Sequence, residues 1–260
     1  MNSTQQAQLN VLLKLDEVCR KHGLTYYLAC GSCLGAVREK GFIPWDHDID
    51  VYMPVADTRK LPDLQSDFGE DLFVRTKDTE PSYGKIKIEI VDRTKKVRVT
   101  KGEQDLGTYD LCIDIYPLYR CPEGKAALTL NVWRSHMLKL LVGGAPKNHG
   151  TLSKVISKVI IALISIGGKE RKIKRLEHKL DYQGESSSVS IYYEGEVSLC
   201  NTFTYDASWF AEPSTLSFEG LSFAGPTDVE HYLTIRYGPN YMVPLPPDKR
   251  QNEMSSELIE

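Results

Sequence analysis

The 260-residue sequence predicts an α+β fold in which a β-sheet core is flanked by helices. Strand and helix patterns alternate between Leu24 and Met53, around a glycine turn. Apolar residues alternate strictly from Tyr83 to Val91, which indicates another strand. From Lys125 to Gln183 apolar residues recur at helical spacing instead. The strands that precede this helical region therefore point to a sheet with helices around it.

Composition and charge are those of an ordinary globular protein, with 41% hydrophobic and 26% charged residues. We expect a single domain over residues 1–260, with a helical insertion at about 124–183 and a flexible tail at about 248–260. The net charge of −3 gives no overall attraction to nucleic acid, despite the basic run Lys169–Lys179, so no nucleic-acid partner is expected. Met1–Asn10 is polar without an apolar core, which predicts a cytoplasmic protein with reduced cysteines.

The amino-terminal elements lead into a possible phosphate site. A first helix is expected over Gln5–Lys21 and a strand over Leu24–Ala29. The strand enters a Gly31-Ser32 turn, after which Leu34–Lys40 is compatible with a helix. A turn that leads into a helix offers backbone N–H groups and the positive end of a dipole to a phosphate, and Ser32 adds a hydroxyl. A Gly-Ser pair is equally common in ordinary turns.

Two cysteines, Cys30 and Cys33, flank this turn. Their spacing occurs in zinc and redox sites, but no second Cys/His pair follows at zinc-finger spacing. Small buried thiols beside a tight turn are the alternative interpretation.

Two aspartates, Asp48 and Asp50, lie on a strand predicted over residues 48–53. Alternate residues of a strand project from one face about 7 Å apart, so both carboxylates could reach one cation. Mg²⁺ prefers such oxygen ligands, and Mn²⁺ is an alternative. A solvated acidic edge is the competing interpretation of these residues.

A third aspartate, Asp114, lies between Ile113 and Ile115 in an apolar run. An acid buried there would cost free energy unless a metal or an ion pair compensates for it. If Asp114 meets Asp48 and Asp50 beside the Gly31-Ser32 turn, the three acids form a divalent-metal site suited to nucleotide chemistry.

Two lysines, Lys85 and Lys87, share one side of the strand predicted over Tyr83–Val91. Asp92-Arg93-Thr94 is expected to turn into a second strand through Val97 and Val99, which would give a hairpin. If this hairpin borders the acids, a lysine could neutralise phosphate charge. The alternative is a solvated face of an edge strand.

The strongest apolar run of the helical region is Val155–Ile164, which Lys158 interrupts and which is too short to span a bilayer. A buried helix is one interpretation. A peripheral membrane contact is the other, because an apolar helix beside lysines and arginines suits an anionic surface. Near the carboxyl end, Thr227 or Asp228 is expected to cap a helix that Gly238 ends.

Several motifs together resemble the LicD family, which is related to the fukutin-type transferases. The two longest are GSCLGAVR at Gly31–Arg38 and GFIPWDHDID at Gly41–Asp50. The resemblance extends to later segments and covers most of the chain except its middle; these segments are Ile113–Leu118, Phe218–Gly220, Tyr232-Leu233, Tyr237-Gly238 and Tyr241-Met242. One difference is His47, where the family usually has Asp; it puts a second metal or a donor contact in question, and His47 could be a simple loop residue.

The resemblance implies a nucleotidyltransferase-like fold and transfer of a phospho-alcohol, such as phosphocholine, from a CDP-linked donor to a glycan hydroxyl. The glycan could be lipid-linked. On this hypothesis Asp48 and Asp50 hold one or two Mg²⁺ ions, Asp114 is a ligand or a general base, and the donor diphosphate lies at Gly31-Ser32. Arg38 would neutralise phosphate, or would pair with Glu39 or Asp46 in a structural role. A nucleotidyltransferase acting on a small molecule and an inactive binding protein are the alternatives.

Overall fold

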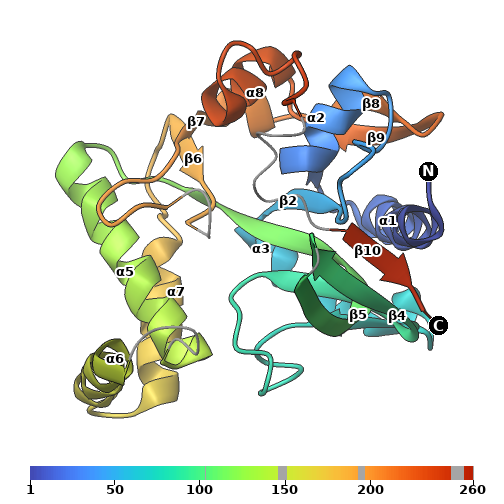
Figure 1. Ribbon diagram of the computed structural model, residues 1–260. Coiled ribbons are helices and arrows are strands. Elements are labelled where there is room, and N and C mark those ends of the chain that lie inside the picture. The colour runs from blue at the N-terminus through green and yellow to red at the C-terminus, as the bar shows by residue number, and fades with distance from the viewer. Residues whose placement is uncertain (103, 146–150, 193–196, 247–254, 260) are drawn as a thin grey trace. The chain divides into compact units, whose positions relative to one another are not determined.

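The computed structural model describes residues 1–102, 104–145, 151–192, 197–246 and 255–259 (Figure 1). Its architecture is mixed, with a β-sheet and helices, as the sequence predicts. The chain forms two compact units. Unit 1 comprises Met1–Arg75, Ile88–Pro117 and Ser208–Glu260, and unit 2 comprises Thr76–Lys87 and Leu118–Ala207.

The sheet of unit 1 places two sequence-distant strands side by side. The strand order is β1-β2-β5-β4-β10, and β3 also pairs with β4. The strands are β1 (Tyr27–Leu28), β2 (Asp50–Pro54), β3 (Leu72–Arg75), β4 (Ile88–Lys101), β5 (Gln104–Arg120) and β10 (Ser255–Leu258). Consequently β2, which begins at Asp50, neighbours β5, which carries Asp114.

Helix α1 (Ser3–His22) closes the core over β4 and β10. Its start is fixed by a capping box, in which the side chains of Asn2 and Gln5 bond each other's backbone N–H, and its end by Gly23 in the left-handed conformation. Leu12 and Leu15 on its inner face are fully buried, and burial of each contributes about 1.5–3 kcal/mol. The predicted first helix is confirmed.

Helix α2 (Cys30–Arg38) begins earlier than the sequence suggests. Ala29 is the extended N-cap residue and Cys30 has φ +46°, so the chain reverses at Cys30 and Gly31-Ser32 lie in the first helical turn. The remaining elements of unit 1 are α3 (Val55–Thr58), α4 (Gln65–Phe68), short 3₁₀ helices at Leu61–Leu64 and Ala207–Phe210, the hairpin β8 (Ser214–Phe218) and β9 (Leu221–Gly225), and α8 (Val229–Tyr237). Asp228 caps α8 and Gly238 ends it, as expected.

Unit 2 contains the helices α5 (Lys125–Gly143), α6 (Thr151–Ile164) and α7 (Lys169–Leu180), which lie together in Figure 1. Helix α7 packs on α5 with Ile173 and Leu180 buried. Strand β6 (Ser188–Ser190) pairs with the end of β5 and with β7 (Tyr205–Asp206). The helical pattern predicted for this region is confirmed. Among the described residues, no helix is both long and apolar enough to cross a membrane.

The structure corrects the predicted hairpin. Asp92–Thr94 is not its turn, because β4 continues from Ile88 to Lys101 and pairs with β5. The register shifts between Asp92 and Lys96, where the Asp92 carboxylate accepts hydrogen bonds from the backbone N–H and the hydroxyl of Thr94. This local bonding produces a bulge that bends the strand without reversing it.

Part of the predicted flexible tail is also ordered. Ser255–Leu258 form β10, which pairs antiparallel with β4, and the Thr4 hydroxyl donates to the Ser256 carbonyl at 3.2 Å. Backbone pairing with a long strand gives these polar residues a fixed place that their composition does not indicate. Residues 248–254 and 260 of that prediction lie outside the described residues.

Candidate active site

Two glycines of α2 allow the loop before β2 to lie against the helix. A Cβ atom at Gly31 would fall 2.2 Å from Asp46 Oδ2, and one at Gly35 would fall 2.4 Å from the Gly41 carbonyl oxygen. A side chain at position 35 would overlap the backbone of Gly41, so this position requires glycine. At position 31 the overlapping atom is the end of the Asp46 side chain, which would have to move aside. Gly31 and Gly35 therefore allow the loop over residues 41–46 to lie close to α2.

Buried polar side chains hold the same loop from other elements. Gln5 Nε2 donates to the Asp46 carbonyl at 3.1 Å, and Gln8 Nε2 donates to the His47 carbonyl at 2.9 Å. The carboxylate of Glu219, at the turn between β8 and β9, accepts from the Phe42 N–H at 2.9 Å. Each bond satisfies a loop group that would otherwise be costly to bury. None of these three residues was predicted as part of the site. The polar Gln5 and Gln8 on the otherwise apolar face of α1 could have indicated that this face contacts the site.

Ser32 connects α2 to β2. Its side-chain oxygen accepts a hydrogen bond from the Asp50 N–H at 2.9 Å, and the Ala29 N–H donates to the Asp50 carbonyl at 3.0 Å. Ser32 is only 4% exposed. Its oxygen thus positions Asp50 in this structure, while the predicted phosphate contact of Gly31-Ser32 stays a prediction.

The three predicted acids come together. Asp48, Asp50 and Asp114 each offer a carboxylate oxygen, and these oxygens lie within 4.8 Å of one another. The Asp114 N–H donates to the Ile49 carbonyl at 2.8 Å, which sets Asp114 beside the two early aspartates. Asp114 is 8% exposed, and its neighbours Ile113 and Ile115 are fully buried. Pairing of β5 with β2 therefore assembles the cluster.

Tyr116 contacts this cluster of acids. Its hydroxyl donates to Asp114 Oδ2 at 3.2 Å. Burial raises the pKa of Tyr116 far above its usual value, and the nearby carboxylates of Asp50 and Asp114 raise it further. Ionisation of the phenol is therefore suppressed, and Tyr116 acts as a hydrogen-bond donor to the acid.

Asp114 also belongs to a second group of possible metal ligands, with Glu89 and Cys112. Glu89 of β4 is directly opposite Asp114 in the β4–β5 register, and Glu89, Cys112 and Asp114 form another group of adjacent ligand atoms. Arg75 Nη1 lies 3.3 Å from Glu89 Oε2, and Arg75 also pairs with Asp110. Glu89 thus has a guanidinium partner from the protein itself.

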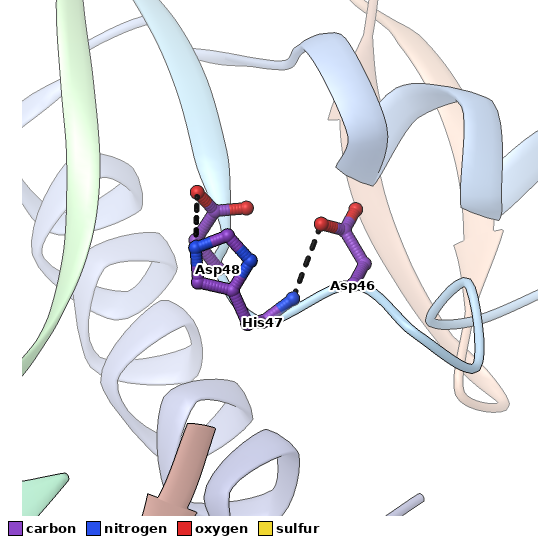
Figure 2. A group of neighbouring side chains, drawn as sticks. All are labelled: Asp46, His47 and Asp48. Carbon is purple, nitrogen blue, oxygen red and sulfur yellow. Dashed lines mark hydrogen bonds and ion pairs between the residues drawn. The ribbon is translucent and has the colours of Figure 1, made fainter. Parts of the chain in front are cut away.

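The loop aspartate Asp46 extends the acidic row (Figure 2). Burial, together with the charge and hydrogen bond of Asp48, raises the pKa of Asp46 to about 8. His47 Nε2 lies 3.7 Å from Asp48 Oδ2, and the His47 N–H donates to Asp46 Oδ1 at 3.2 Å. Asp46 was not among the predicted site residues, although its alternation with Asp48 and Asp50 was a usable signal.

A pocket of about 600 Å³ opens beside these residues. Its lining combines Gly31 of the α2 N-terminus, the acids Asp46, Asp48 and Asp50, and aromatic and apolar side chains from the loop before β2, the end of α8 and the chain after α8. The aromatic members are Trp45, Tyr237 and Tyr241. The pocket therefore joins a negatively charged side to a side that could hold an organic group.

Arg38 lies in the wall of this pocket. Its Nε donates to Glu39 Oε1 at 2.8 Å and its Nη1 donates to the Tyr241 carbonyl at 3.2 Å. The structural pairing with Glu39 is present, and the side chain also ties α2 to the segment that carries Tyr241. A contact of Arg38 with phosphate stays a prediction.

The two predicted lysines belong to unit 2 and precede β4. Lys85 is exposed and its Nζ lies 5.4 Å from the centre of the Tyr83 ring, whereas Lys87 is buried. The strand that was expected to align them starts only at Ile88. Their role at a phosphate stays a prediction.

The two cysteines beside α2 are buried thiols. Burial raises the pKa of Cys33 well above its usual value, so the thiolate that zinc or redox chemistry needs is disfavoured. Neither Cys30 nor Cys33 belongs to a group of adjacent metal-ligating atoms within the described part of the chain.

The segment that contains this site is similar to known proteins. Residues 23–136 match the family model described as "LicD/FKTN/FKRP, nucleotidyltransferase domain". A curated relative, the "Lipopolysaccharide cholinephosphotransferase LicD" of Haemophilus influenzae (strain ATCC 51907 / DSM 11121 / KW20 / Rd), is 39% identical over 64 residues. That match covers 25% of this chain and 24% of the relative. The segment that matches the LicD family model, residues 23–136, includes Asp48, Asp50 and Asp114.

Proposed function

We propose that this chain is a metal-dependent phosphotransferase of the LicD type on a nucleotidyltransferase-like fold. It moves a phospho-alcohol group from a CDP-linked donor to a hydroxyl of a cell-surface glycan or its precursor. The observation that carries the proposal is the gathering of Asp48, Asp50 and Asp114 beside the N-terminus of α2 and an open pocket.

The donor set fits Mg²⁺, with Mn²⁺ as an alternative. Carboxylate oxygens are the hard ligands that these ions prefer, and Mg²⁺ usually takes one or two carboxylates together with substrate phosphates. Three carboxylates with oxygens within 4.8 Å repel one another, and a divalent cation would relieve that repulsion. When bound, the ion would neutralise developing charge on the phosphates.

The residues of the chain position the donor. Backbone N–H groups in the first turn of a helix have no partners within the helix, so the α2 N-terminus at Gly31 could receive oxygens of the donor diphosphate. Arg38, at the other end of α2, supplies a positive charge to the wall of the same pocket. Phosphoryl transfer depends mainly on such positioning and charge neutralisation.

The transfer step forms one bond and breaks one bond. The acceptor hydroxyl oxygen bonds to the phosphorus that carries the alcohol, and the bond from that phosphorus to the bridging oxygen breaks, so that CMP leaves with the electron pair. Asp114 either holds the cation or takes the hydroxyl proton. Tyr116, which donates to Asp114, orients this carboxylate.

The aromatic side of the pocket suits the alcohol. Trp45, Tyr237 and Tyr241 lie in its wall, and aromatic rings attract quaternary ammonium groups through their π faces. Phosphocholine is therefore the first donor group to test, in keeping with the cholinephosphotransferase name of the relative.

The proposed acceptor is a glycan, and a lipid-linked glycan is included. The apolar helix α6 and its cationic neighbours support a peripheral contact with a membrane at its cytoplasmic face. A second candidate function is transfer of a nucleoside monophosphate to a small molecule, which the family description as a nucleotidyltransferase domain favours.

Product identity distinguishes the two functions. The protein is incubated with Mg²⁺ and a panel of CDP-alcohols, with and without glycan acceptors, and nucleotides are separated by ion-exchange chromatography. CMP that forms with an acceptor and disappears with EDTA supports the proposal. Pyrophosphate released from a nucleoside triphosphate supports the second function instead, and turnover of neither class contradicts both.

A further inference from the structure

Helix α6 exposes its apolar face. Val155, Val159 and Leu163 follow one another at i, i+4 and i+8, and Ile166, just after the helix, is exposed as well. Val159 is 54% exposed and Leu163 is 61% exposed. Ile156 and Ile160 lie beside this stripe and are exposed too. The most apolar side of α6 therefore faces outward from unit 2.

The inner side of α6 carries both polar and apolar residues. Ser157 is only 8% exposed, and Ile161 and Ile164 are partly buried. A helix on the surface of a protein in water normally buries its apolar stripe. In α6 a stripe of large apolar residues is exposed on the outer side as well, which indicates that this side is adapted to a surface other than water.

The neighbouring residues are strongly cationic. From Val155 to Leu180 the chain carries seven Lys and Arg residues and two acids, Glu170 and Glu177, although the whole chain has a net charge of −3. The cations are Lys158, Lys169, Arg171, Lys172, Lys174, Arg175 and Lys179, and all except the partly buried Lys172 are exposed. Glu177 is paired with Lys77 at 3.2 Å.

We propose that the outer face of α6, with the cations of α7, docks on an anionic phospholipid bilayer. Val155, Val159, Leu163 and Ile166 would enter the boundary between headgroups and acyl chains, and the lysines and arginines would contact lipid phosphates. With 14 residues, α6 is about 21 Å long, which is too short to cross a bilayer but sufficient to lie in its interface.

Charge selects the bilayer over a second copy of the chain. A symmetric dimer through α6 would bring two equally cationic segments together, and their repulsion would oppose the apolar contact. Anionic headgroups instead attract the cations that flank the apolar stripe. This inference extends the proposed function. Membrane docking would bring the enzyme to a lipid-carried glycan, and only this purpose rests on the proposed function.

The test measures vesicle binding of the full chain without substrates. Co-sedimentation is compared for vesicles of phosphatidylcholine alone and for vesicles with phosphatidylglycerol, in low and high salt. The test variant carries Val159→Gln and Leu163→Gln. The matched control is Leu199→Gln, which changes an apolar residue of unit 2 that is 69% exposed but lies outside α6.

Wild type and Leu199→Gln are expected to bind anionic vesicles, with binding weakened by salt, while the double variant loses at least about tenfold in partition coefficient. Circular dichroism checks that the double variant stays folded, and light scattering gives the oligomeric state. Absence of vesicle binding by the wild type overturns the proposal. Equal vesicle binding by the double variant and the wild type also overturns it. A third contradicting result is a wild-type dimer that does not bind vesicles and that the two substitutions convert to a monomer.

Failure of this inference and failure of the proposed function give different results. CMP release from a CDP-alcohol with a soluble glycan is expected to be the same for the wild type and the double variant. Vesicle binding without CDP-alcohol turnover contradicts the function alone, and turnover without vesicle binding contradicts the membrane surface alone.

Discussion

The loop before β2 and the helix α6 depart from ordinary burial in opposite directions. In the loop and the residues that hold it, polar groups are buried, among them Gln5, Gln8 and Ser32. In α6, apolar side chains such as Val159 and Leu163 are exposed. Buried polar groups cost free energy unless they are bonded, and exposed apolar stripes are rare on proteins without a partner surface.

The kinds of contact that the two regions make also differ. Gln5, Gln8 and Ser32, which hold the loop, each make a specific hydrogen bond to its backbone, at Asp46, His47 and Asp50 respectively. The exposed residues of α6 share only their apolar character and their helical spacing. Directional bonds indicate a site of fixed geometry, whereas a non-directional apolar stripe indicates a surface that adheres.

The largest expected effect tests the loop side of this comparison. Asp50→Asn keeps the size of the side chain but removes a charge from the group of three acids. Loss of several kcal/mol of charge stabilisation should lower the transfer rate by about 1,000-fold or more, with little change in the fold. The assay is CMP release, and Asp63→Asn, an exposed acid outside the group, is the control. An unchanged rate in Asp50→Asn would defeat the assignment of this acid.

The next effect tests whether the contact between α2 and the loop is as close as the structure shows. Alanine in place of a helical glycine normally stabilises a protein by up to about 1 kcal/mol. Gly31→Ala should instead destabilise this one and lower the transfer rate by about 10- to 100-fold, because its Cβ would meet Asp46.

A double-mutant cycle isolates that contact. Adding Asp46→Ala to Gly31→Ala removes the atoms that clash, so urea unfolding should show that the two changes are not additive. Additive free energies of unfolding would mean that Gly31 and Asp46 are not in contact.

A smaller effect tests the hydrogen bond from the Asp50 N–H to Ser32. Ser32→Ala leaves that N–H group without its acceptor, which should lower the free energy of unfolding by about 1–3 kcal/mol. Ser66→Ala, at an exposed serine, should change it by less than about 0.5 kcal/mol. Equal values for the two variants would show that the buried bond contributes nothing to stability.

The smallest effect tests the α6 side. Leu163→Gln should change the free energy of unfolding by less than about 0.5 kcal/mol, because the side chain is already in water. Leu12→Ala, in the core of unit 1, should cost about 2–5 kcal/mol. A large loss in Leu163→Gln would mean that the α6 stripe is buried in solution, and the comparison between the two regions would fail.

The sequence predicted the local elements of the site well, because short-range patterns specify them. Alternation predicted a strand over residues 48–53, but β2 begins only at Asp50, so Asp48 lies in the loop before it. Helical spacing located α1 and the helices of unit 2. The isolated acid between two isoleucines, Asp114, also signalled a special position. These signals depend only on residues close in sequence.

Long-range features could not be predicted in the same way. The strand order that sets β5 beside β2 is not encoded in either strand alone, and the bulge at Asp92 depends on side-chain bonds that imitate a turn. The anchoring by Gln5, Gln8 and Glu219 links segments up to 177 residues apart. Lys85 and Lys87 show the limit of periodicity as a signal. The alternating pattern begins at Tyr83, whereas β4 starts only at Ile88.

The central claim is that Asp114 joins Asp48 and Asp50 to hold one divalent cation. Its most direct test is titration of the metal-free protein with Mn²⁺, with bound ion followed by electron paramagnetic resonance. We expect a site in the wild type and in Asp63→Asn whose affinity falls by at least about tenfold in Asp114→Asn. Equal affinity in the wild type and Asp114→Asn would contradict the account.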